Sequence, residues 1–212
     1  MSTNQGRVLI VGRSTAVLLD AVALLRGRGY AANASNQFDQ LLTDYDFGSV
    51  DLVVFGGMVP PEKKERLQEQ ILAVNPHVTF LPGLGGVAPL LAAQIEQFFC
   101  AVTPEFSYDA TSRVLHVTTD TVAKVAVQGI WGTFVPPEPV GHEISVFEAE
   151  LDAGRHAIPI PPVVPSESSF VAVRVGDGVA VRQIGATPQA VRALTPGSLP
   201  VPEPISTRLP WM

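Results

Sequence analysis

The residues whose types and spacing could support chemistry lie in three loops, each of which follows a short apolar run. The first loop combines a glycine, an arginine and two hydroxyl residues, and the other two loops are rich in glycine. The candidate ligand-binding residues are Gly12, Arg13, Ser14, Thr15, Gly56, Gly57 and Gly83. Free backbone N–H groups at the start of a helix bind anions, and an arginine beside them adds positive charge. The loops therefore predict either a site for a small anionic ligand or tight turns that need glycine only for its conformational freedom.

The other reactive side chains form no catalytic or metal-binding motif. The four histidines lack the spacing of zinc ligands, although His116 and His156 lie on expected strands and could meet across a sandwich. The single cysteine, Cys100, excludes an internal disulfide and a paired-cysteine metal site, and we interpret it as a buried thiol at a helix end. We therefore expect no catalytic residue, no metal and no cofactor. Enzymatic activity stays an open question at this point, with a non-enzyme favoured.

The first loop belongs to the stretch 7–29, around which the chain is organised. Residues 8–11 form a continuous apolar run, which is typical of a strand buried on both faces. Ser14 or Thr15 can cap the next segment, whose apolar residues recur at helical spacing. Gly29 would end that helix in a left-handed conformation. The stretch predicts a strand, a short loop and a helix, which together make the first half of a βαβ unit.

The same alternation of apolar runs and amphipathic stretches continues to residue 100. Further strands are expected at 30–34, 51–55 and 78–81, with a helix after each, the last at 87–99. Alternating strands and helices imply a doubly wound parallel sheet with helices on both faces. Right-handed crossovers leave few topologies, of which the strand order 2-1-3-4 is the simplest. Residues 1–100 are therefore expected to be an α/β domain.

Beyond residue 101 the composition changes to β-branched residues punctuated by proline and glycine. About seven short strands are expected up to residue 184, among them 124–131 and 143–151, with residues 136–139 as a loop. The pattern predicts an antiparallel β-sandwich at 101–185, so the fold class is α/β plus all-β. The remainder, 186–212, contains six prolines and is expected to be an extended tail. We expect it to dock on the first domain or on a second subunit, through Leu209 and Trp211.

Two stretches carry a resemblance to a known family: VLIVGRSTAVLLDAVALLRGRGY and DLVVFGGMVPPEKKERLQEQILAVNPHVTFLPG. In strand length and helix spacing, residues 7–82 resemble a response-regulator receiver domain of the flavodoxin-like class. A receiver holds Mg²⁺, a hard cation that needs oxygen ligands, with an acidic pair where Gly12 and Arg13 stand here. It carries its phospho-accepting aspartate at the position of Gly56 and a serine or threonine at the position of Pro82. The resemblance implies a degenerate, or pseudo-, receiver without phosphorylation chemistry.

The run VLIVG before a helix, with the later DLVVFGG, is also similar to Rossmann domains of the short-chain dehydrogenase kind. That class binds a dinucleotide over a loop with three glycines, of which only Gly12 remains, while Ser14 and Val17 stand at the other two positions. An NAD(P)- or nucleotide-binding oxidoreductase-like protein that uses the loop 12–15 stays an alternative. Residues 114–185, with LDAGRHAIPIP and the final hairpin, are similar to immunoglobulin-like or fibronectin-type-III-like modules.

Composition limits the function further. Of 212 residues, 46% are hydrophobic and 16% are charged, and the net charge of −6 comes without a basic cluster, which argues against nucleic-acid binding. No stretch approaches the roughly 20 apolar residues of a membrane span, and no signal peptide is visible, so we expect a cytoplasmic protein. The expected function is regulation or assembly through a protein partner. A dimeric structural subunit, joined through the sandwich and the tail, is a further alternative.

Overall fold

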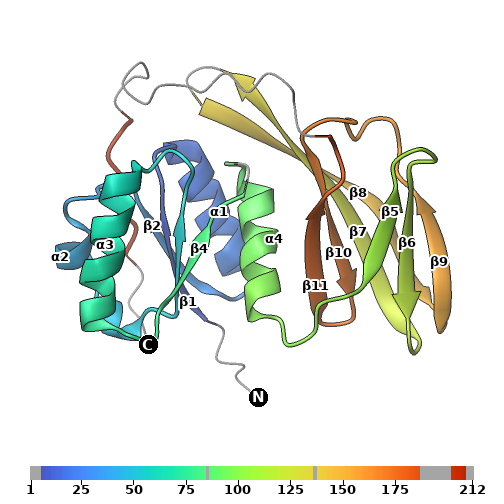
Figure 1. The fold of residues 1–212 in the computed structure, drawn as a ribbon, viewed down its shortest axis with the longest axis horizontal. Coiled ribbons are helices and arrows are strands. Elements are labelled where there is room, and N and C mark those ends of the chain that lie inside the picture. The colour runs from blue at the N-terminus through green and yellow to red at the C-terminus, as the bar shows by residue number, and fades with distance from the viewer. Residues whose placement is uncertain (1–5, 85, 136–137, 187–201, 209–212) are drawn as a thin grey trace. The chain divides into compact units, whose positions relative to one another are not determined.

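The structure is a computed structural model that describes residues 6–84, 86–135, 138–186 and 202–208 (Figure 1). The chain divides into two compact units. The α/β unit comprises Met1–Ala88, Phe134–Pro139 and Leu194–Met212, and the sandwich unit comprises Pro89–Thr133 and Val140–Ala193. None of the helices in the described ranges is both long and apolar enough to cross a membrane.

The α/β unit contains a four-stranded sheet in the predicted order β2-β1-β3-β4, and all its neighbouring strands are parallel. The strands are β1 (Arg7–Val11), β2 (Ala31–Ser35), β3 (Leu52–Phe55) and β4 (Thr79–Pro82). The central strand β3 is buried along its whole length, as its unbroken apolar run predicts, whereas the edge strand β4 is only partly buried. From the strand order, β2 and β4 are the two edge strands of the sheet.

Helices cover both faces of this sheet, because right-handed crossovers in opposite directions place α1 and α3 on opposite sides (Figure 1). The helical elements are α1 (Thr15–Gly27), α2 (Leu41–Asp44), the 3₁₀ turn η1 (Phe47–Ser49) and α3 (Pro61–Val74). On the α3 side, Leu67 and Ile71 join Leu9 and Val53 in one buried cluster. Gly29 has a φ of 89° just after α1, in the left-handed region that the sequence predicts for it.

The sandwich unit contains two antiparallel sheets, of order β5-β6-β9 and β11-β10-β7-β8. Its elements are α4 (Ala88–Phe99), β5 (Phe106–Asp109), β6 (Val114–Thr119), β7 (Ala123–Val135), β8 (Glu138–Leu151), β9 (Gly154–Pro159), β10 (Ser169–Val175) and β11 (Gly178–Gln183). Side chains from both sheets, such as Leu115 and Val117 from one and Val127 and Val173 from the other, share a single core. This is the predicted sandwich.

Polar contacts join helix α4 to the sheet β11-β10-β7-β8 of the sandwich unit. Glu96 is 7% exposed and forms an ion pair with Arg174 of β10 at 2.6 Å. The side chain of Gln97 accepts a hydrogen bond from the N–H of Val181 at 2.7 Å. Because Glu96 is buried, its charge needs the partner that Arg174 provides.

Strands β7 and β8 extend beyond the predicted ranges 124–131 and 143–151. Paired side chains stabilise the added length: the rings of Trp131 and His142 are stacked with centroids 5.3 Å apart, and Thr133 Oγ1 lies 2.8 Å from His142 Nε2. Cross-strand pairs of this kind stabilise a sheet. The sequence did not predict this length, because the prolines after Val135 favoured a loop and because local composition does not show which side chains pair across strands.

Candidate functional site

The predicted glycine loops lie together at the carboxyl ends of β1, β3 and β4, as the parallel sheet requires. The N–H of Gly56 donates to the carbonyl oxygen of Val11 at 2.8 Å, and the N–H of Gly83 donates to Phe55 at 2.9 Å. A Cβ atom at Gly56 would lie 3.4 Å from the Cα of Gly12, so these two positions approach closely. Gly57 is exposed and has nothing within 4 Å of the place where a Cβ would stand.

The other predicted residues begin helix α1, and a carboxylate of the chain itself is bound there. The side chain of Ser14 accepts from the N–H of Val17 at 3.5 Å, which is the predicted cap, and Arg13 before it is half-buried. The N–H groups of Thr15 and Ala16 donate to the two carboxylate oxygens of Glu138, at 2.9 and 3.2 Å. Both partners belong to the α/β unit. A carboxylate stabilises the positive end of a helix dipole, so Glu138 takes the position that we predicted for an anionic ligand.

Residues 202–208, the C-terminal segment, continue from this loop along β2. The hydroxyl of Thr15 and the side-chain amide of Asn36 both donate to the carbonyl oxygen of Glu203, at 2.9 and 2.8 Å. The amide oxygen of Asn36 accepts from the N–H of Ile205 at 2.8 Å. The segment therefore contacts the start of α1 and the end of β2 together.

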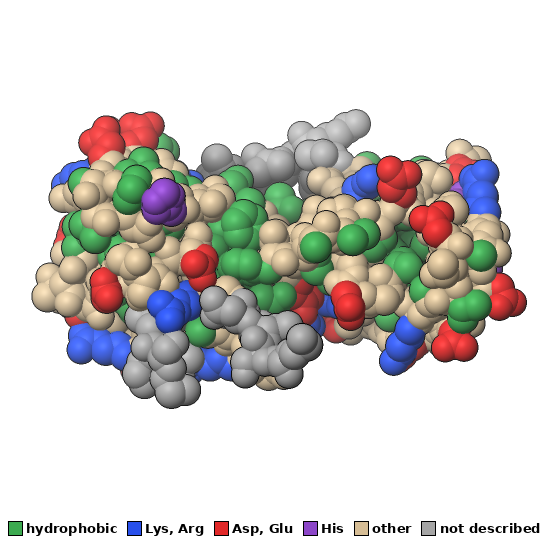
Figure 2. Space-filling model, turned by 90° about the horizontal axis from the view of Figure 1, so that it is seen from below, with side chains coloured by type: hydrophobic (Ala, Val, Ile, Leu, Met, Phe, Trp, Pro, Cys, Tyr) green, Lys and Arg blue, Asp and Glu red, His purple; other side chains and the backbone are tan. Residues whose placement is uncertain are grey.

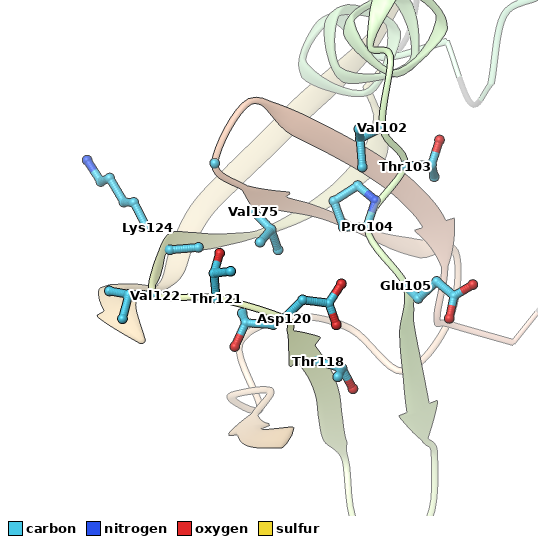
Figure 3. Close-up of a pocket in the computed structure, with 13 residues that line it drawn as sticks. Val102, Thr103, Pro104, Glu105, Thr118, Asp120, Thr121, Val122, Lys124 and Val175 are labelled. Atoms are coloured by element: carbon cyan, nitrogen blue, oxygen red, sulfur yellow. The ribbon is translucent and has the colours of Figure 1, made fainter. Parts of the chain in front are cut away.

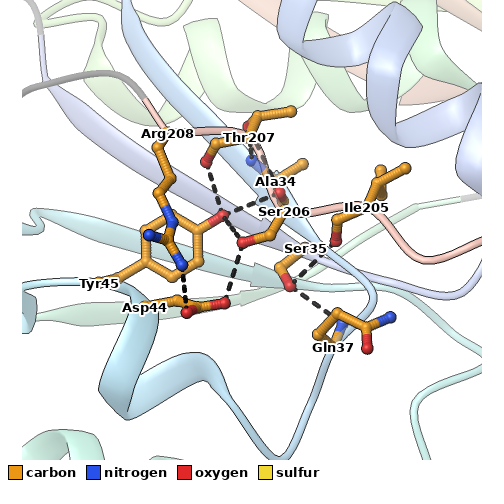
Figure 4. Close-up of polar contacts among 9 residues, drawn as sticks. All are labelled: Ala34, Ser35, Gln37, Asp44, Tyr45, Ile205, Ser206, Thr207 and Arg208. Atoms are coloured by element: carbon orange, nitrogen blue, oxygen red, sulfur yellow. Dashed lines mark hydrogen bonds and ion pairs between the residues drawn. The ribbon is translucent and has the colours of Figure 1, made fainter.

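The C-terminal segment then pairs with the free edge of β2. Ser35 and Ser206 form an antiparallel bridge (Figure 4). The N–H of Thr207 donates to the carbonyl oxygen of Ala34 at 3.0 Å, and the N–H of Asn36 donates to Ile205 at 3.3 Å. These bonds satisfy backbone groups that an edge strand otherwise leaves unpaired.

Two side chains beyond β2 complete this contact, and we call residues 33–36 with Asp44 and Tyr45 the β2 edge site. The hydroxyl of Tyr45 donates to the carbonyl oxygen of Thr207 at 2.6 Å and lies 3.0 Å from the carbonyl oxygen of Ala34. Burial raises the pKa of Tyr45, because the site disfavours the charged phenolate. Asp44 accepts from the hydroxyl of Ser206 at 3.1 Å and pairs with Arg208 (Figure 4).

Neither contact was predicted from the sequence: at the start of α1 it left open a small anionic ligand or tight turns, and neither the carboxylate of Glu138 nor the pairing of residues 202–208 with β2 was foreseen. Glu138 is 123 residues from Thr15 and falls in a stretch expected to be a loop. A signal was nevertheless present, since α1 has no acidic residue in its first turn to interact with its dipole. The tail was expected to dock on the first domain or on a second subunit, and its described residues 202–208 contact the α/β unit. The proposed anchors Leu209 and Trp211 lie outside the described residues.

His116 and His156 lie on neighbouring strands of the sandwich unit. His116 is paired with Ala157 and His156 with Val117 on the neighbouring strands β6 and β9. Since successive side chains of a strand point to opposite faces, the two histidines do not meet, and that expectation was wrong. The described residues contain no group of three or more His, Cys, Asp or Glu side chains that could hold a metal ion.

A separate cavity of about 620 Å³ lies in the sandwich unit, between residues 102–105, the turn 118–124 and Val175 (Figure 3). Its polar lining consists mainly of threonine hydroxyls with Glu105 and Asp120. Lys124 points away from the other labelled residues, and its ammonium pairs with Glu148 at 2.6 Å. The charged groups around this cavity therefore do not converge on one point.

Acidic and basic side chains are interspersed on the face of the molecule that Figure 2 shows. On the face drawn in Figure 2, the Lys and Arg side chains of the described residues lie in small groups with acidic side chains among them. This distribution agrees with a sequence that has 14 basic and 20 acidic residues and no basic run. On this face the described residues therefore form no large patch of one sign that would steer a charged ligand.

No protein-family model and no curated protein matches the sequence. One similar solved structure is a GH3 beta-glucosidase from Bifidobacterium adolescentis, with 13% sequence identity and a TM-score of 0.29. The similarity covers 90% of this chain and 51% of that chain, so this chain spans about half the length of that structure. A likeness at this level carries no argument about fold or activity.

Proposed function

We propose that this chain is a non-catalytic regulatory or assembly protein that acts through contact with other proteins. In this proposal the α/β unit is a pseudo-receiver, and the sandwich unit is a module of the immunoglobulin or fibronectin-III type. The strand order β2-β1-β3-β4 supports the first assignment, because the flavodoxin-like class begins with that order. The positions of Gly12, Gly56 and Pro82 at the carboxyl ends of β1, β3 and β4 support the absence of phosphorylation chemistry.

The observation that carries the proposal is that the β2 edge binds an extended polypeptide segment. Addition of a strand to an exposed sheet edge is a common mode of protein recognition, in which main-chain hydrogen bonds supply affinity and side-chain contacts supply specificity. Both kinds of contact are present here, from the backbone of Ala34 and from the side chains of Asp44 and Tyr45. An edge that binds one segment of this kind is suited to a partner segment of similar chemistry.

The nucleotide-binding alternative has a physical obstacle in the same structure. A pyrophosphate at the start of α1 would have to displace the carboxylate of Glu138 from the N–H groups of Thr15 and Ala16. The glycine positions that a dinucleotide loop needs are filled by Ser14 and Val17, whose side chains crowd the approach of a phosphate.

A thermal-shift screen with NAD(H), NADP(H), ATP and cyclic nucleotides tests the proposal. We expect no change in Tm, because a ligand that binds only the native state would stabilise it by mass action. A rise of several degrees with any of them would favour the nucleotide-binding alternative and refute the non-catalytic binding protein. Acetyl phosphate with Mg²⁺ is expected to leave the mass of the chain unchanged, and a phosphoryl group on an aspartate would contradict the pseudo-receiver assignment.

A further inference from the structure

The β2 edge site contacts three consecutive residues of the C-terminal segment through their side chains. At the first position, Ser206 donates its hydroxyl hydrogen to Asp44, and its oxygen lies 3.0 Å from the hydroxyl of Tyr45. A residue without a hydroxyl would leave this oxygen of Asp44 without that donor, and the Asp44 side chain is only 10% exposed. The first position therefore requires a small hydroxyl residue.

The second and third positions also make side-chain contacts, although the Arg208 side chain is 66% exposed. The side-chain oxygen of Thr207 accepts from the N–H of Ala34 at 2.7 Å, and its hydroxyl lies 3.3 Å from the side-chain oxygen of Asn33. At the third position, Arg208 forms an ion pair with Asp44, so an acidic residue there would be repelled. The site therefore fits the sequence hydroxyl residue, threonine, arginine in an extended conformation.

None of the described residues 202–208 belongs to the buried cluster on the α3 side of the sheet. That cluster contains residues of β1, β3, α3 and the loops between them. Ile205, which is half-buried, is the one large apolar side chain in the described segment. Since the contacts that the described segment makes with β2, Asp44 and Tyr45 are polar, another polypeptide of the same pattern can make the same contacts in its place.

We propose that the β2 edge site binds an extended segment of a partner protein in which a small hydroxyl residue, a threonine and an arginine follow one another, and that residues 202–208 compete with it from within the chain. This inference rests on the proposed function, for which it names the kind of partner. The competition can be measured as a change in the apparent affinity for a partner. A tethered segment acts at an effective concentration on the order of millimolar, so a partner binds weakly until the segment is released. Weakening the internal segment tenfold then tightens the apparent affinity for a partner about tenfold.

The test uses the full chain with one change in the segment. Thr207→Pro removes the N–H that donates to Ala34 and the hydroxyl that contacts β2. A fluorescent peptide with the sequence of residues 202–208 is titrated against both chains, and binding is followed by anisotropy. We expect the Thr207→Pro chain to bind the peptide at least tenfold more tightly than the wild-type chain does. Glu203→Gln is the matched control, since the contacts of Glu203 with Thr15 and Asn36 use its backbone carbonyl.

Variant peptides test the specificity. Peptides with Ser206→Val or Arg208→Glu are expected to bind the Thr207→Pro chain at least tenfold more weakly. If Thr207→Pro does not fold, exchanging the two charges of the ion pair still decides the question, with Asp44→Lys in a chain whose residues 202–208 are unchanged and Arg208→Glu in the peptide. The Asp44→Lys chain should then prefer the Arg208→Glu peptide to the original one, because the sign of the ion pair is reversed.

Three results would overturn the inference. One is a folded Thr207→Pro chain that binds the peptide no better than the wild-type chain, and another is equal binding of a scrambled peptide. The third is a doubled mass in light scattering of the wild-type chain that is lost in Thr207→Pro, because it would assign the site to a second copy of this chain. If the peptide fails while nucleotides leave Tm unchanged, this inference falls and the proposed function stands.

Discussion

The hydroxyl of Tyr45 offers the sharpest test of how the C-terminal segment is held. Tyr45→Phe deletes one oxygen and keeps the ring, which packs in the buried cluster on the α3 side of the sheet. Tyr45 is 6% exposed, and its hydroxyl donates to the carbonyl oxygen of Thr207 at 2.6 Å. The carbonyl oxygen of Ala34, also within 3.0 Å of that hydroxyl, keeps its bond from the N–H of Thr207 in the variant.

The magnitude follows from these contacts. One intramolecular hydrogen bond contributes about 0.5–1.5 kcal/mol net, and the half-buried segment lets water reach the carbonyl of Thr207 after the change. A loss of about 1 kcal/mol lowers the ratio of docked to released segment roughly fivefold. The α/β core should lose little else, because the phenylalanine ring fills the same volume.

Hydrogen exchange measures this ratio at the segment itself. The N–H groups of Ile205 and Thr207 are bonded to Asn36 and Ala34 only while the segment is docked, so their protection should fall roughly fivefold in Tyr45→Phe. Tyr108→Phe makes the same chemical change in the sandwich unit, where the ring packs against the other core, and should leave these amides unchanged. Unchanged protection in Tyr45→Phe, or an equal loss in both variants, would refute the reasoning.

Three further predictions address other parts of the chain. Burial raises the pKa of Tyr45, so the stability that depends on its protonated form is complete below the ordinary pKa of about 10 and is lost as the pH rises through the raised pKa. Ultraviolet titration should show one tyrosine that ionises late and that Tyr45→Phe removes. Identical titration curves for the two chains would contradict this. In Gly129→Ala the new Cβ would lie 2.6 Å from a methyl of Val164, so urea unfolding should show a loss of about 1–3 kcal/mol, against less than about 0.5 kcal/mol for Gly57→Ala; equal losses would count against tight packing at Gly129. Cys100 is half-buried, and burial raises the pKa of its thiol, so an aromatic disulfide reagent should react with it more slowly in the native chain than in urea. A native rate equal to that in urea would count against this.

Local patterns in the sequence were sufficient for the architecture. The unbroken apolar run of β3 and the helical spacing in α1 and α3 are signals that each segment carries alone, and together they predict the parallel sheet and its order. Alternating residues and the hairpin turn before Gly178 did the same for the sandwich. The polar contacts of the site could not be predicted from local patterns, because their partners are far apart in the sequence. Glu138 is 123 residues from Thr15, and Ser206 is 161 residues from Tyr45.

The buried polar residues of β2 were nevertheless a signal for the edge contact. Asn33 is 1% exposed and Ser35 is fully buried, although β2 is an edge strand whose sequence is short and weakly apolar. Polar side chains on an edge are expected to meet water unless another segment covers them. The polar residues within β2 therefore indicate a covering segment only once their burial is known, because burial cannot be read from the sequence.

Two explanations of that covering segment differ in what they require of its side chains. A segment that only protects a sheet edge from pairing with other chains needs its backbone groups, which here are the N–H of Thr207 and the carbonyl of Ile205. The contacts from Asp44 to Ser206 and Arg208 are superfluous for that purpose, since any residue that tolerates an extended backbone would protect the edge equally well. Their presence is the reason to propose that the edge distinguishes one sequence from another. Discrimination of this kind is useful where more than one segment can reach the site, and for this reason we propose the β2 edge, rather than the glycine loops, as the place where a partner would bind.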